Sequence, residues 1–96
     1  MTSLDLESTV RPLDEALARE VDGETLLVSL ATGRYYGLDE VGTAIWTHIG
    51  RGARLDEVLE KLLAEFDVDR DTARDDLLRL ASELCEAGLL EVAPAA

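Results

Sequence analysis

Residues 32–39 are the part of this sequence best placed to do chemistry, and that chemistry is main-chain hydrogen bonding. Their centre, Arg34-Tyr35-Tyr36-Gly37, is typical of a short aromatic β-strand with one charge and no proline. Little in such a strand prevents another chain from pairing along its edge. The edge is therefore a candidate slot for an extended peptide, although two tyrosines that simply fill a sheet would give the same pattern.

Side chains that could support catalysis are sparse. His48 and Cys85 are the only histidine and cysteine, and a single residue of each type offers no metal-ligand spacing. We expect His48 to cap carbonyls at a helix end and Cys85 to be a small buried hydrophobe. The paired carboxylates at 56–57 and 75–76 are adjacent, so they diverge around a helix and indicate a solvated face. The sequence predicts no catalytic residue, no metal and no cofactor.

A predicted helix over residues 72–87 carries more apolar surface than packing against its neighbours requires. Leu77, Leu80 and Leu84 fall within one narrow arc. A second arc lies to one side of it and consists of Arg74, Leu78, Ala81, Ser82 and Cys85. This second arc is a candidate wall of a groove whose other wall is the strand at 34–38. A wider contact between helix and sheet explains the arc equally well.

The composition limits the size of the fold and the kind of partner. The 96 residues, 47% of them apolar, suffice for one domain with a core. Nine Lys and Arg against 21 Asp and Glu give a formal net charge of −12, which argues against nucleic acid. A single cysteine fits a reducing compartment, and no apolar run approaches the roughly 18 residues of a membrane span. We therefore expect a cytoplasmic protein that binds neither nucleic acid nor membrane.

Apolar residues that alternate with a period of two predict three antiparallel strands, over residues 15–21, 25–30 and 34–38. Asp22-Gly23 separates the first two strands, and Asp-Gly between extended runs is a strong hairpin signal. In the third strand Tyr36 and Leu38 are expected to face the core, which leaves Tyr35 the more accessible.

From residue 39 the apolar period changes to about 3.6. Asp39 is a predicted cap for a first helix that Gly50 ends, and a second helix opens at Leu55. Asp69 or Asp71 is expected to cap the third helix. An extended piece is expected over 89–92.

These elements predict an α+β fold, winged helix-turn-helix-like, with a three-stranded antiparallel sheet followed by three helices. The expected organisation is a loose N-terminal segment over 1–13, a folded domain over 14–92 and a C-terminal tail over 93–96.

The order of several short segments resembles the PqqD-like family of peptide recognition elements of ribosomally made, modified peptides. The resemblance covers about residues 14–92. By its freestanding length and its Gly-Arg-Tyr-Tyr-Gly-Leu stretch at 33–38, the chain most resembles the leader-binding members of lasso peptide biosynthesis. It is carried by Leu26-Leu27-Val28, by Thr32-Gly33-Arg34-Tyr35-Tyr36-Gly37-Leu38-Asp39, by Ala44-Ile45-Trp46, by Asp76-Leu77 and by Glu86-Ala87-Gly88-Leu89-Leu90.

The resemblance implies a leader peptide that adds a fourth strand beside the third and lies between that strand and the third helix. It also implies a leader with a Tyr-x-x-Pro motif and a separate cysteine protease that removes it. The implied contacts come from Arg34, Tyr35, Tyr36 and Gly37 and, with the arc geometry above, from Arg74, Leu78, Ala81, Ser82 and Cys85.

The sequence thus predicts a non-catalytic adaptor that captures a precursor leader and presents it to a processing protease. Two alternatives remain open at this stage. One is a winged-helix transcription regulator, which the negative charge disfavours. The other is a dimerising structural module that uses the same strand edge on a second copy of itself.

Overall fold

The structure, a computed structural model, describes residues 4–93 of the chain. Three strands form an antiparallel sheet in the order β2-β3-β4. These are β2 (Ala16–Val21), β3 (Glu24–Ser29) and β4 (Tyr35–Leu38). Asp22 and Gly23 both have positive φ, at 54° and 82°, as a tight two-residue hairpin turn requires. The predicted hairpin is confirmed.

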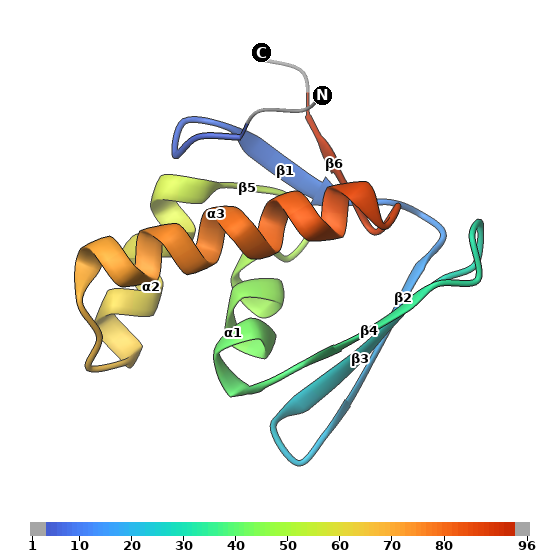
Figure 1. Cartoon of the computed structure of the whole chain (residues 1–96), viewed down its shortest axis with the longest axis horizontal. Helices are drawn as coiled ribbons and strands as arrows, with labels where there is room; N and C mark the ends of the chain where they lie inside the picture. Colours follow the sequence, from blue (N-terminus) through green and yellow to red (C-terminus); the bar gives the residue numbers. More distant parts are fainter. Residues whose placement is uncertain (1–3, 94–96) are drawn as a thin grey trace.

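Three helices follow the sheet: α1 (Glu40–Ile49), α2 (Leu55–Glu65) and α3 (Arg70–Glu86). The Asp39 carboxylate accepts from the Gly42 N–H at 2.8 Å, and Asp69 accepts from the Thr72 N–H at 3.2 Å. Both side chains satisfy backbone donors that the first helical turn leaves free. In Figure 1 the helices gather on one side of the molecule, and the ribbon of β2, β3 and β4 projects to the other.

A second sheet was not expected from the sequence. It consists of β1 (Thr9–Pro12), β5 (Ala53–Arg54) and β6 (Leu90–Val92), with β1 in the centre. The prediction of a loose segment over 1–13 is therefore wrong for residues 9–12, because Val10 is fully buried in this sheet. Of the expected tail over 93–96, only Ala93 lies within the described residues, and its N–H donates to the Thr9 carbonyl.

The core forms where the inner face of the larger sheet meets the helices. Leu27 of β3 and Leu38 of β4 point inward and are buried. The helices contribute a larger set of buried side chains, namely Ile45, Ile49, Leu55, Val58, Leu59, Leu62, Leu77, Ala81 and Leu84. The predicted α+β class, with a three-stranded antiparallel sheet followed by three helices, is confirmed. Within the described part of the chain, no helix combines the length and hydropathy needed to cross a bilayer.

Candidate functional site

The outer edge of β4 is unpaired, since within residues 4–93 this strand pairs only with β3. The Ser29 N–H donates to the Arg34 carbonyl at 2.8 Å, which marks a hydrogen-bonded pair of residues. Such pairs alternate along an antiparallel ladder, so Tyr36 and Leu38 also turn their main-chain groups toward β3. The N–H and C=O groups of Tyr35 and Gly37 therefore point to the open edge. Only Tyr35 and Gly37 offer unpaired main-chain groups, whereas the sequence suggested an open edge along all four residues from Arg34 to Gly37.

The side chains of β4 alternate as expected. Tyr35 is 71% exposed and stands on the outer face of the sheet. Tyr36 is half-buried and packs against the core, and Leu38 is buried. Arg34 lies just before the strand, where its N–H donates to Thr32 Oγ1 at 3.2 Å.

A cavity of about 360 Å³ opens where the end of β4 meets all three helices. Gly37 and Leu38 form its strand side, and residues of α3 form the opposite side. Its apolar lining comes from Leu38, Val41, Ile45, Leu62, Phe66, Val68, Ala73 and Leu80. An apolar cavity beside unpaired main-chain groups can hold both the backbone and the side chains of an extended peptide.

The polar rim of this cavity is mostly acidic. Asp39, Asp76 and Glu83 contribute carboxylates, and Arg79 contributes the only guanidinium among the lining residues. Arg79 is paired with Asp76 at 3.3 Å, across one helical turn. The rim therefore carries a net negative charge, in keeping with the whole chain.

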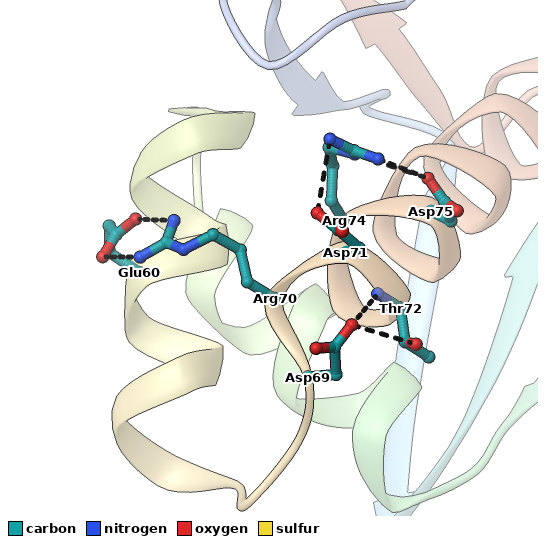
Figure 2. A network of polar contacts seen from close by, with 7 residues as sticks. All are labelled: Glu60, Asp69, Arg70, Asp71, Thr72, Arg74 and Asp75. Atoms are coloured by element: carbon teal, nitrogen blue, oxygen red, sulfur yellow. Dashed lines mark hydrogen bonds and ion pairs between the residues drawn. The ribbon is translucent and has the colours of Figure 1, made fainter.

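Of the nine residues predicted to contact a ligand, Gly37 is the one that lines this cavity. Ala81 is fully buried in the core. Leu78 and Cys85 are half-buried against the core, and Ser82 is half-buried as well. The guanidinium of Arg74 lies between Asp71 and Asp75, at 3.7 and 3.4 Å (Figure 2). The predicted arc thus lies on the flank of α3 that does not line the cavity. Its part in binding stays a prediction.

Sequence reasoning missed the flank of α3 that does line the cavity. Ala73 and Leu80 stand seven residues apart there, just as Leu78 and Cys85 do on the other flank. The sequence assigns Leu80 to the core arc with Leu77 and Leu84, and Ala73 is itself buried, so a helical wheel gives no sign that these two residues also line a cavity. The flank that lines the cavity is the one that faces β4, and that is set by the three-dimensional path of the chain.

Hydrogen bonding and burial shift the pKa values of some side chains on the helices. Hydrogen bonds from Arg70 lower the pKa of the Glu60 carboxyl, and this pair links α3 to α2 (Figure 2). Burial raises the pKa of the Cys85 thiol, which keeps it protonated and poorly nucleophilic. His48 contacts the Glu65 carboxylate rather than capping carbonyls. Among the described residues, no group of three or more His, Cys, Asp or Glu side chains is placed to hold a metal ion.

An open strand edge beside an apolar cavity, on a small α+β scaffold, is the architecture of a peptide-binding domain. The family described as coenzyme PQQ synthesis protein D (PqqD) matches residues 24–90. This chain belongs to the PqqD family, and the resemblance inferred from the sequence is confirmed. No curated protein matches the chain.

Two solved structures share the fold. TbiB1, solved in complex with the TbiA(beta) leader peptide, is 34% identical, with a TM-score of 0.77. The match covers 88% of this chain and 99% of that one. A lasso peptide synthetase B1, complexed with the leader peptide, is 24% identical, with a TM-score of 0.69. That match covers 85% of this chain and 96% of the other, and at this identity it supports only the shared fold.

Proposed function

We propose that this protein is a non-catalytic adaptor of lasso peptide biosynthesis that binds the leader of a precursor peptide. The leader adds a strand to the open edge of β4 and places alternate side chains in the cavity. The observation that carries the proposal is the open edge of β4, where the main-chain groups of Tyr35 and Gly37 are unpaired and Gly37 also lines the cavity. The 34% identical TbiB1, solved with a leader peptide, supports it.

Simple energetics indicate that both parts of the site are needed. Tyr35 and Gly37 together offer two donors and two acceptors, and four hydrogen bonds contribute about 4 kcal/mol net. Micromolar affinity needs about 8 kcal/mol, before the cost of ordering a flexible peptide. The difference must come from apolar side chains that enter the cavity, at roughly 1.5–3 kcal/mol each. Because the peptide needs apolar side chains that fit the cavity, the site selects peptides by their sequence.

The rest of the proposed role concerns partners. The bound leader, with the Tyr-x-x-Pro motif that the family resemblance implies, is presented to a separate cysteine protease in the cytoplasm. We assign neither His48 nor Cys85 a part in that cleavage, and the raised pKa of the half-buried Cys85 thiol disfavours its nucleophilic thiolate form.

The test is fluorescence anisotropy with a labelled synthetic leader, taken from a short precursor gene to be sought next to the gene for this chain. Tyr35→Pro removes an N–H that faces the open edge, so we expect leader affinity to fall at least about tenfold. Proline is tolerated at the first residue of an edge strand, so the melting temperature should change little.

Tyr35→Ala is the matched control, since it removes the same ring but keeps the N–H. We expect this variant to bind the leader more tightly than Tyr35→Pro does. Absence of binding by the wild-type protein at tens of micromolar would refute the proposal, and equal affinities of the two variants would refute strand addition.

A further inference from the structure

The outer face of the β2-β3-β4 sheet, which points away from the helices, is unusually apolar. Cross-strand register places Leu17, Val28 and Tyr35 in one row and Arg19, Leu26 and Gly37 in the next. The exposed large apolar side chains on this face are Leu17, Val21, Leu26, Leu30 and Tyr35. Contiguous exposed apolar patches often mark a binding surface.

Gly37 interrupts this face where it reaches the open edge. A hollow lies there, bordered on the sheet by Gly37, Leu26, Arg19 and Val21. Its remaining lining, toward the β2–β3 turn and the end of β4, is Asp22, Glu24, Thr25, Leu38 and Asp39. A Cβ atom added at Gly37 would meet nothing within 4 Å, so the residue is not glycine for lack of room. The backbone of Gly37 is also not in the left-handed region that favours glycine. Neither packing nor backbone conformation in the free protein explains why this strand position lacks a side chain.

We propose that Gly37 opens a second subsite for the added strand, on the outer face of the sheet, that takes one large apolar side chain. The proposal deepens the proposed function and rests on it. The leader residue in register with Gly37 projects to the same face as Gly37. With no side chain in the way, it reaches across β4 and packs on Leu26, which is 45% exposed.

The geometry selects for size and shape. Strands lie about 4.8 Å apart, so Leu26 is roughly 9–10 Å from the backbone of an added strand. A phenylalanine, tryptophan, tyrosine, methionine or leucine spans much of this gap, whereas alanine, valine and serine do not. Arg19 lies in the same row beyond Leu26 and makes no ion pair within residues 4–93. Its free guanidinium favours an aromatic ring, whose face attracts a cation.

The consequence is a leader read on both faces of the sheet. Side chains that alternate with the Gly37-facing residue point to the inner face and enter the cavity between β4 and α3. A peptide with suitable residues on one face only would lose part of its contacts. The second subsite therefore restricts the set of peptides that the open edge accepts.

The experiment is an alanine scan of the labelled leader, measured by anisotropy against four full-length proteins: wild type, Leu26→Ala, Gly37→Val and Ala18→Val. On the wild type we expect alanine at one large apolar leader position to weaken binding about tenfold. On Leu26→Ala the same position should lose under about threefold, because its contact is already gone. Gly37→Val places methyl groups between the two side chains and should reduce the loss in the same way.

Controls separate this contact from the fold and from binding in general. Ala18→Val adds two methyl groups on β2, at the opposite edge and on the inner face of the sheet, and should leave the wild-type scan unchanged. Valine suits a strand better than glycine, so the melting temperature of Gly37→Val should stay equal or rise. The Leu26→Ala arm decides the matter even if Gly37→Val folds poorly.

Two results overturn the inference in different ways. A leader that binds tightly but gives the same alanine scan on all four proteins removes the second subsite and leaves the proposed function intact. A wild-type protein that binds no leader removes both.

Discussion

At the scale of single residues, Asp39 takes part in three features of the fold. It ends β4, caps α1 and stands on the rim of the cavity. Its carboxylate is 2.8 Å from the Gly42 N–H, and Gly42 is packed so closely that an added Cβ would lie 3.2 Å from Leu38. The cap and this close contact hold the end of β4 against the first turn of α1.

We predict that Asp39→Ala lowers the free energy of unfolding by about 1 kcal/mol, because one helix N-terminal donor loses its acceptor. Asp39→Asn keeps an acceptor oxygen and should lose only a few tenths. Urea unfolding followed by circular dichroism measures both. Equal stability of the alanine variant and the wild type would show that the cap contributes nothing.

At the scale of elements, α3 has two flanks, and only one of them lines the cavity. Leu80 lies on the flank that lines the cavity, whereas Leu78 lies on the flank that the sequence favoured. Both leucines are half-buried in the same helix, which makes them a matched pair.

We predict that Leu80→Gln weakens leader binding about tenfold, because it puts an amide into the apolar lining of the cavity. Leu78→Gln should change the affinity less than about twofold. Anisotropy titrations compare them, with thermal melts to confirm that both variants are folded. The reverse order of affinities would favour the arc of Arg74, Leu78, Ala81, Ser82 and Cys85.

The sequence was sufficient for elements whose signals are local. The three strands of the larger sheet and all three helices lie within about two residues of their expected bounds, because alternation, the Asp-Gly turn and the aspartate caps are read over short windows. The flank of α3 that faces β4 could not be predicted, since it depends on how elements far apart in the chain pack. The free main-chain groups of β4 needed the register of its pairing with β3.

On the scale of the whole molecule, the small β5-β1-β6 sheet joins segments that are distant in sequence. β5 has two residues and β6 three, and Val10 is the only fully buried residue of β1. β6 matches the extended piece expected over 89–92, but strands this short carry little periodic signal. The partners of β1 lie 43–45 residues away in β5 and 78–82 residues away in β6. Only tertiary contacts reveal this sheet.

We predict that Val10→Ala lowers the free energy of unfolding by about 2 kcal/mol, because it leaves a cavity in a closed core. Val92→Ala, at the paired position of β6, should cost under about 0.5 kcal/mol because Val92 is 41% exposed. Chemical denaturation measures the difference. Equal stabilities of the two variants would mean that residues 9–12 are as loose as the sequence alone suggested.

The pairing of β1 with β6 also brings the first and last strands of the fold together, at the end of the molecule opposite the β2–β3 hairpin (Figure 1). A tether attached near Thr9 or near Ala93 would emerge from the same spot. A fusion of this domain to a larger enzyme, through either of its ends, should therefore leave the open edge of β4 accessible. The same fold could then act as a separate protein or as a domain fused to an enzyme.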